Sequence, residues 1–401
     1  MKDKLLLQAL VCSAFLCSVS VGTVAAAVSA GVKAGDTEQS SWMDRTDIGI
    51  GVQGSQKDTY HNYKTAVTPY SISTAVVYHS EHDSKQELRD AQYFIETIQP
   101  IKRYGKNADS ILFVQSRIDG NGGEKISTNT YWNGGHGPQS YMQPSYIDKG
   151  EIVQHESLGL VGSVGVGYRR LSKHEHAYAG VNAFYDYAFK DKLSRVGVGL
   201  EYVAGLNKLS VNAYHGVSSK VTDPYYFTNS LVIVPRADEF HNPEDGPPNG
   251  FHKMRYAYEH VLDGYNVRYT RDFKNTRWIS PYIDAYYWKT KSPRIHPIDM
   301  MYIDQHKWQS IKGMKIGAKV NVTPHISVDL GFNRNNISSG IPYVSIMYTL
   351  GQSQYAYFGG KHNEDSVTTA RSKMLDKVKR NEMVVESYWE QNYTDGPWDH
   401  L

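Results

Sequence analysis

One short stretch, 214–219, holds the residue types of a hydrolytic site. His215 lies three residues before Ser218, and such a pair could activate the serine hydroxyl as a nucleophile. Activation requires the two side chains within hydrogen-bonding reach of each other, and a third group that orients the base. On a β-strand, however, side chains three residues apart point to opposite faces. We therefore expect no catalysis here and interpret His215 as an interfacial residue beside a loop.

Metal and cofactor chemistry have little support in the sequence. His174 and His176 could bind a divalent ion weakly, but we favour a solvated turn for them. The only cysteines, Cys12 and Cys17, lie in an apolar run near the start of the chain, so the remainder can form neither a disulfide nor a thiolate site. Without a phosphate-binding loop or a basic patch, we expect no enzyme activity, no cofactor, no metal and no nucleic-acid partner.

Most charged residues of interest alternate with apolar residues. In 195–202, the apolar residues Val196, Val198 and Leu200 share one face, and Arg195 and Glu201 share the other. This period of two is typical of a β-strand with one apolar face, and it recurs along the chain. The polar face would carry the following charges: Arg169, Asp186, Arg195, Glu201, Lys315, Lys319 and Asp329.

Such alternation fits a soluble β-sandwich and a transmembrane β-barrel equally well, but two observations favour the barrel. The apolar faces lack charge, as lipid requires, and the charges of the polar faces suit a hydrated lumen. The 31 tyrosines and seven tryptophans could form the aromatic girdles at the two membrane interfaces. We therefore predict an all-β fold, a transmembrane antiparallel up-and-down barrel.

The spacing of the alternating segments predicts about twelve strands. The long connections 119–157, 218–263 and 290–311 are separated by even numbers of strands, so they fall on one side, as extracellular loops do. The same parity makes 252–261 a hairpin arm inside a loop. Segments 46–54 and 70–79 compete for one place, and we prefer the first. The predicted strands are 46–54, 93–101, 110–118, 158–170, 177–188, 194–203, 207–217, 264–273, 278–289, 312–322, 325–333 and 341–350.

The N-terminus has the features of a cleavable signal peptide. Lys2 and Lys4 precede an apolar run, and small residues follow at 24–27. We predict a signal peptide at 1–27, a short periplasmic lead at 28–45, the barrel at 46–350, and a lumen linker with a short tail at 351–401. The expected location is the bacterial outer membrane.

Several of these segments resemble one known family. The runs GVGYR at 165–169, GVNAFYDY at 180–187, RVGVGLEY at 195–202 and LSVNAY at 209–214 are similar to the inverse autotransporter β-domain, the translocator barrel of intimins and invasins. The run at 370–388, ARSKMLDKVKRNEMVVESY, resembles the linker that follows that barrel.

The resemblance implies a linker that forms a helix inside the lumen and then carries a passenger to the cell surface. Its residues here would include Asp376, Arg380, Asn381 and Glu386. The residues themselves make 364–380 a charged helix candidate, which Asp365 and Ser366 could cap. Because the sequence stops at Leu401, we expect little or no passenger, which puts adhesion through one in doubt.

The leading hypothesis is therefore a translocator and structural barrel of the inverse autotransporter type. One alternative is a surface adhesin that binds a host or envelope ligand through its long loops, where Tyr131, Trp132, Tyr141 and Tyr146 could serve as anchors. The other is a channel with an open lumen. The expected partners are outer-membrane lipid, the barrel-assembly machinery and periplasmic chaperones.

Overall fold

The computed structural model describes residues 41–67, 75–105, 109–135, 146–222, 254–273, 276–289, 310–353, 355–360 and 370–394. Its elements are nearly all β-strands, with 3₁₀ helices η1 (Trp42–Arg45) and η4 (Ser372–Leu375). In this part of the chain, no helix has the length and apolar character to cross a membrane.

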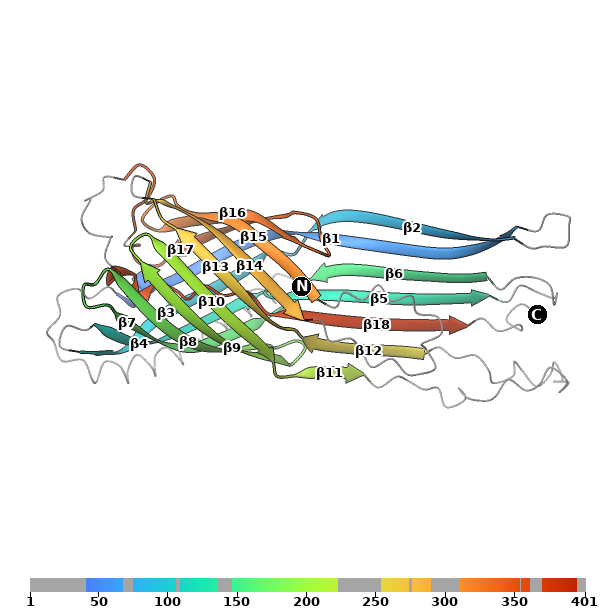
Figure 1. Cartoon of the computed structure of the whole chain (residues 1–401), viewed down its shortest axis with the longest axis horizontal. Coiled ribbons are helices and arrows are strands. Elements are labelled where there is room, and N and C mark those ends of the chain that lie inside the picture. Colours follow the sequence, from blue (N-terminus) through green and yellow to red (C-terminus); the bar gives the residue numbers. More distant parts are fainter. Residues whose placement is uncertain are drawn as a thin grey trace, which may run out of the picture.

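Twelve strands form a closed antiparallel barrel (Figure 1). Each strand pairs with the next, and the first part of β1 pairs with both β3 and β17, which closes the ring. The prediction of twelve strands with 46–54 as the first is confirmed. The barrel strands are β1 (Thr46–Val67), β3 (Gln92–Tyr104), β4 (Ser110–Gly120), β7 (Val161–Leu171), β8 (Ala177–Ala188), β9 (Leu193–Ala204), β10 (Asn207–Gly216), β13 (Asp263–Arg271), β14 (Ile279–Lys289), β15 (Ser310–Asn321), β16 (Ile326–Asn335) and β17 (Ile341–Thr349).

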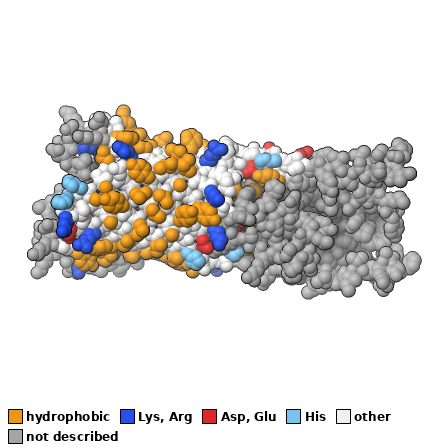
Figure 2. Space-filling model, viewed as in Figure 1, with side chains coloured by type: hydrophobic (Ala, Val, Ile, Leu, Met, Phe, Trp, Pro, Cys, Tyr) orange, Lys and Arg blue, Asp and Glu red, His pale blue; other side chains and the backbone are white. Residues whose placement is uncertain are grey.

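The alternation in sequence becomes an apolar outside and a polar inside. Val198 and Leu200 are each 60% exposed on the outer face of β9, whereas Arg195 on the same strand is fully buried. Figure 2 shows apolar side chains spread over the outer face of the barrel. Exposed apolar surface of this extent needs a non-aqueous neighbour, since it would be unfavourable in water.

A second sheet extends beyond one end of the barrel (Figure 1). It arises where β1 continues past Gly54 and where long connections form hairpins. Residues 75–79 of the segment 70–79, the rival for a barrel position, belong to this sheet, and so do residues 254–261 of the hairpin arm expected at 252–261. The additional strands are β2 (Ala75–Leu88), β5 (Glu124–Gly135), β6 (Tyr146–Glu156), β11 (Ser219–Thr222), β12 (Met254–Val261) and β18 (Val384–Thr394). We call this end of the barrel the sheet end and the opposite end, with its short turns, the turn end.

The C-terminal strand β18 is an inner strand of this sheet. It runs parallel to β5 on one side and antiparallel to β12 on the other. Residues 370–383, which precede it, cross the barrel interior from the turn end. Within 370–383 the only helical element is the single 3₁₀ turn η4. The prediction of a helix over 364–380 is therefore wrong for 370–380, and residues 364–369 lie outside the described residues.

The segment stays extended because its backbone groups bond the barrel wall. Arg169 donates hydrogen bonds to the carbonyl oxygens of Met374 and Asp376. The side-chain amide of Gln115 accepts from the N–H of Val378 and donates to its carbonyl oxygen. An α-helix would need these same groups for its own hydrogen bonds. Wall contacts therefore replace the helical ladder.

Candidate functional site

The site is the path of residues 370–383 through the barrel, and side chains of the wall bond its backbone at successive points. Beyond Arg169 and Gln115, Asn212 donates to the carbonyl oxygen of Lys379 at 3.0 Å. The hydroxyl of Tyr214 accepts from the N–H of Asn381 at 2.8 Å. These four wall residues come from three different strands, β4, β7 and β10, so the segment has partners on several sides.

Arg169 is positioned near the turn end, two residues from the end of β7. Its Nε donates to Glu201 at 2.8 Å, although β8 lies between their strands. Gly180 of β8 stands opposite both residues, and a Cβ there would lie 2.8 Å from Arg169 Cγ and 3.2 Å from Glu201 Oε2. Because Gly180 has no side chain, Arg169 and Glu201 can form their ion pair across the inner face of β8. Nη1 of Arg169 remains available to donate to the carbonyl oxygens of Met374 and Asp376.

Arg195 makes the corresponding contacts near the sheet end. It donates to Asp186, its direct cross-strand partner, at 2.8 Å, and to the carbonyl oxygens of Asn381 and Glu382 at 2.9 and 2.8 Å. Asp186 also accepts from Ser163 at 2.7 Å and from Arg380 of the segment at 2.5 Å. A buried carboxylate between two guanidiniums joins the wall to the segment.

Further ion pairs continue along the segment. Lys208 bonds Asp376 at 2.9 Å, Lys373 bonds Asp272 at 2.8 Å, and Arg371 bonds Glu175 of the β7–β8 turn at 2.6 Å. Hydrogen bonding from Arg371 is the main cause that lowers the pKa of the Glu175 carboxyl below its usual range. These contacts give the segment a fixed register against the wall.

The remaining expected lumen charges, Lys315, Lys319 and Asp329, lie on β15 and β16. Asp329 accepts a hydrogen bond from Tyr282 at 2.7 Å, and the directly opposite Lys319 faces a cavity. Lys315 faces a separate cavity nearer the sheet end. Among the expected linker residues, Asp376, Arg380 and Asn381 lie inside the barrel, whereas Glu386 lies in β18, beyond the barrel.

The exit at the sheet end is lined by apolar residues that the sequence analysis did not select. Met383 and Val385 are buried in a cluster with Val261, and Val384 is buried in another with Trp288. We call Met383, Val384 and Val385 the exit collar. The short apolar run gave no sign of this role, because its partners come from segments distant in sequence.

A partly buried contact between a histidine and a carboxylate lies just outside the exit collar, at the start of β5. His155 of β6 and Glu124 of β5 approach to 2.8 Å, and the N–H of Glu124 donates to the carbonyl oxygen of Met383. Burial would raise the pKa of Glu124, but the hydrogen bond and charge of His155 outweigh it and lower that pKa to about 2. Glu124 therefore stays ionised at neutral pH and fixes β5 beside the collar.

The residues considered for catalysis and metal binding have other partners. Nδ1 of His215 lies 3.0 Å from Asp263, whereas the Ser218 hydroxyl accepts from the Ser194 N–H at 2.6 Å. The rings of His174 and His176 are 6.5 Å apart. Among the described residues, no group of three or more potential ligands is placed to hold a metal ion.

The structure does not describe the side chains of the four aromatic residues proposed as loop anchors. Tyr131 and Trp132 belong to β5 and Tyr146 to β6, but only their backbone is described, and Tyr141 lies outside the described residues.

No curated protein sequence matches the chain. Many solved structures are similar to it, including the following three. A chain from a study of in-meso crystallization of membrane proteins is 11% identical, with a TM-score of 0.44, over 84% of this chain and 99% of that one. An outer membrane channel from Pseudomonas putida F1 is 9% identical, with a TM-score of 0.35, over 79% and 99%. The beta domain of the Bordetella autotransporter BrkA is 8% identical, with a TM-score of 0.27, over 76% and 99%.

The family comparison is decisive. The profile of the inverse autotransporter β-domain matches residues 151–382, which is more than half of the chain and includes both wall arginines and residues 370–382 of the segment inside the barrel. This range agrees with the resemblance found in the strands at 165–214. The chain therefore belongs to the inverse autotransporter β-domain family and is an outer-membrane β-barrel of that type.

Proposed function

We propose that this barrel is a translocator that conducts its own C-terminal segment from the periplasm to the cell surface and then retains it. Short periplasmic turns and longer extracellular connections are the rule for such barrels, so we assign the turn end to the periplasm and the sheet end to the exterior. The proposal includes no catalysis.

The observation that carries the proposal is that the wall bonds the backbone of the segment. Arg169, Arg195, Gln115, Asn212 and Tyr214 all contact peptide N–H or carbonyl groups. Every residue has a carbonyl and nearly every residue has an N–H, so such contacts are open to any extended chain in the lumen. A wall of this kind suits a path along which different sequences pass.

Retention would depend on the contacts at the exit. The residues of the exit collar are buried as members of two apolar clusters. The chain continues from the collar as β18, an inner strand between β5 and β12. A strand with ladder hydrogen bonds on both sides cannot slide without breaking them together. We infer that the outer sheet holds the emerged chain in place.

We further propose the domain limits of the sequence analysis, with a signal peptide at 1–27, a periplasmic lead at 28–45, the barrel at 46–350 and the linker and tail at 351–401. Barrel-assembly machinery and periplasmic chaperones would be the partners during biogenesis. The alternating, lipid-facing strands support this route, because such a chain needs protection from water until it inserts.

Cysteine labelling on intact cells tests the orientation. In a chain with Cys12 and Cys17 changed to serine, Asn392→Cys places a thiol in β18, and Lys173→Cys places one in the β7–β8 turn. We expect a membrane-impermeant maleimide to label Asn392→Cys on intact cells and Lys173→Cys only after the outer membrane is permeabilised. The reverse pattern, or labelling of Asn392→Cys only after permeabilisation, would overturn the proposal.

A display assay tests translocation itself. With a reporter fused after Leu401, we expect Arg169→Lys and Arg195→Lys together to lower surface display at equal barrel abundance. Lysine keeps the charge but has no planar fork to bond a carboxylate and a carbonyl at once. Arg170→Lys, whose side chain is exposed on the outer face, is the matched control. Equal display by all variants would show that the backbone contacts do not serve export.

A further inference from the structure

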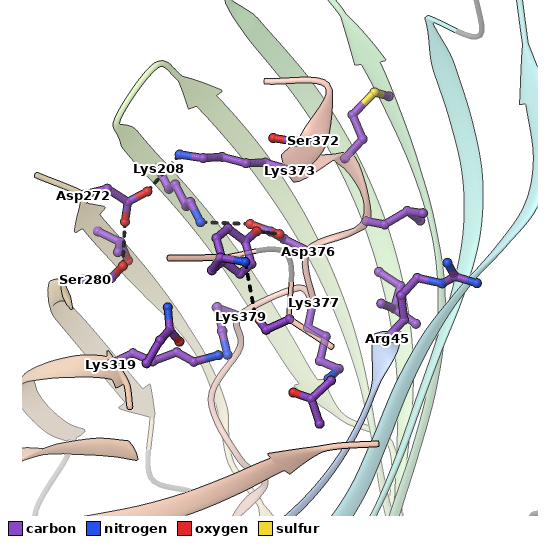
Figure 3. Close-up of a pocket in the computed structure, with 18 of the residues that line it drawn as sticks. Arg45, Lys208, Asp272, Ser280, Lys319, Ser372, Lys373, Asp376, Lys377 and Lys379 are labelled. Atoms are coloured by element: carbon purple, nitrogen blue, oxygen red, sulfur yellow. Dashed lines mark hydrogen bonds and ion pairs between the residues drawn. The ribbon is translucent and has the colours of Figure 1, made fainter. Parts of the chain in front are cut away.

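A cavity of about 1040 Å³ lies beside the segment in the turn-end half of the lumen (Figure 3). Its lining includes wall residues such as Lys208, Asp272 and Lys319, together with Lys373, Asp376 and Lys379 of the segment. We call this cavity the vestibule. Its position near the short turns places it on the periplasmic side under the assignment above.

The vestibule has a strong excess of positive charge. Ten cationic side chains line it against five carboxylates. The other cavity, of about 210 Å³ near the sheet end, has seven cationic side chains against six carboxylates, so charge is nearly balanced there. The excess is therefore a local property of the vestibule, and the general need for charged residues in a hydrated lumen does not explain it.

Several of the vestibule lysines have carboxylate partners. Lys208 is paired with Asp376, Lys373 with Asp272, and Lys377 with Asp47. In Figure 3 the first two pairs are marked by dashed lines. These ion pairs account for part of the charge and leave a smaller set of lysines to explain.

Lys319 and Lys379 make no hydrogen bond or ion pair through their ammonium groups with any residue that the structure describes. Lys319 stands directly opposite Asp329 on the neighbouring strand without an ion-pair contact, and the Asp329 carboxylate accepts a hydrogen bond from the hydroxyl of Tyr282. Lys379 is held by the wall through its backbone carbonyl, and it lines both the vestibule and the smaller cavity. Two lysines, one from the wall and one from the segment, thus face the same space.

Like charges that face a cavity of reduced dielectric constant repel each other, and an anion between them relieves that repulsion. Each ammonium group is a compact charge with three donors, which suits the oxygen atoms of a phosphate-type ion. We propose that the vestibule binds a free oxyanion of the phosphate class, with Lys319 and Lys379 as its ligands. The surrounding wall admits a small ion from the periplasm and separates the site from lipid tails.

The full chain in alkyl maltoside micelles, titrated calorimetrically with inorganic phosphate, tests the site. We expect saturable binding, and a loss of at least tenfold in affinity for the double variant Lys319→Gln with Lys379→Gln. Lys315→Gln is the matched control, because it removes one positive charge from the same strand but lines only the balanced cavity. Its affinity should stay within about twofold of the parent.

Heat-modifiable mobility on gels checks that each variant is folded. If the double variant does not fold, protection of Lys319 and Lys379 from an amine-reactive reagent by phosphate in the parent protein replaces it as the readout. Absence of saturable binding, an equal loss in Lys315→Gln, or no protection of the two lysines would each overturn the proposal. So would protection by phosphatidylglycerol vesicles in place of phosphate, since it would assign the site to a lipid headgroup.

Discussion

The buried contact between Asp186 and Arg380 gives the sharpest test of how the segment is held. Asp186 is 1% exposed and accepts from Ser163, Arg195 and Arg380 at distances between 2.5 and 3.1 Å. Asp186→Ala would leave two buried guanidiniums without their carboxylate. Removal of one partner of a buried ion pair costs about 3–5 kcal/mol, because the remaining charge stays desolvated. We expect a loss of that size in the free energy of unfolding.

Asp186→Asn should be milder than Asp186→Ala. The amide keeps one acceptor oxygen in nearly the same place, so one of the two guanidiniums retains a hydrogen bond. A double-mutant cycle with Arg380→Ala then isolates the contact between the wall and the segment. For residues in direct contact within one network, a coupling energy of about 1–3 kcal/mol is expected.

The exposed pair between Glu175 and Arg371 is the matched control, since it also joins the wall to the segment. Side chains there are 43% and 32% exposed, so solvent screens the attraction and the coupling should be much smaller. Denaturant unfolding in micelles, followed by tryptophan fluorescence, measures both cycles. Additive effects of Asp186→Ala and Arg380→Ala within about 0.5 kcal/mol, or equal coupling in the two cycles, would refute the reasoning.

Val198→Arg on the lipid face should lower the free energy of unfolding in lipid vesicles by about 2–4 kcal/mol, while Val198→Leu should be nearly neutral. Equal stability of the two variants would contradict the assignment of Val198 to the lipid face of β9. Val385→Asp should hydrate the exit collar and raise ion conductance in planar bilayers, because apolar constrictions exclude water, and Val217→Asp on the outer surface should not. Acid should loosen β5 from the collar: the depressed pKa of Glu124 stabilises the fold above about pH 4.3, and that contribution is lost as pH falls toward about 2. Protease cleavage of β5 should follow this course, and His155→Gln should remove most of the pH dependence.

The barrel could be predicted from sequence because its determinants are local. Alternation of apolar and polar residues fixes the face to which each side chain points, and a short turn fixes the register of a hairpin. The pair of Asp186 and Arg195 follows from these two rules, since the β8–β9 turn places them opposite each other. The pair of Arg169 and Glu201 does not, because it crosses an intervening strand at Gly180.

The fate of the C-terminal segment could be predicted only in part. The resemblance to the family linker implied an interior position, but the resemblance and the charged residues also suggested a helix, which depends on backbone groups that the wall here uses for itself. The outer sheet was beyond prediction for another reason. β18 pairs with β5 from a position more than 250 residues away and in parallel, so no turn specifies the register. Pairing of this kind depends on the assembled barrel.

The two sorts of contact inside the lumen differ in what they require of the segment. Arg195 bonds carbonyl oxygens, so under the proposed translocator role it could hold any residue that passes. The ion pair at Asp186 forms only when a cation such as Arg380 arrives beside it. Both contacts involve the same wall residues, since Arg195 and Asp186 are bonded to each other. General backbone contacts would therefore guide the chain while it moves, and specific charges would add stability only in the final register. The position at which the segment stops is then set by its own sequence, through Arg371, Lys373, Asp376 and Arg380, while the wall itself needs no change between the moving and the retained state.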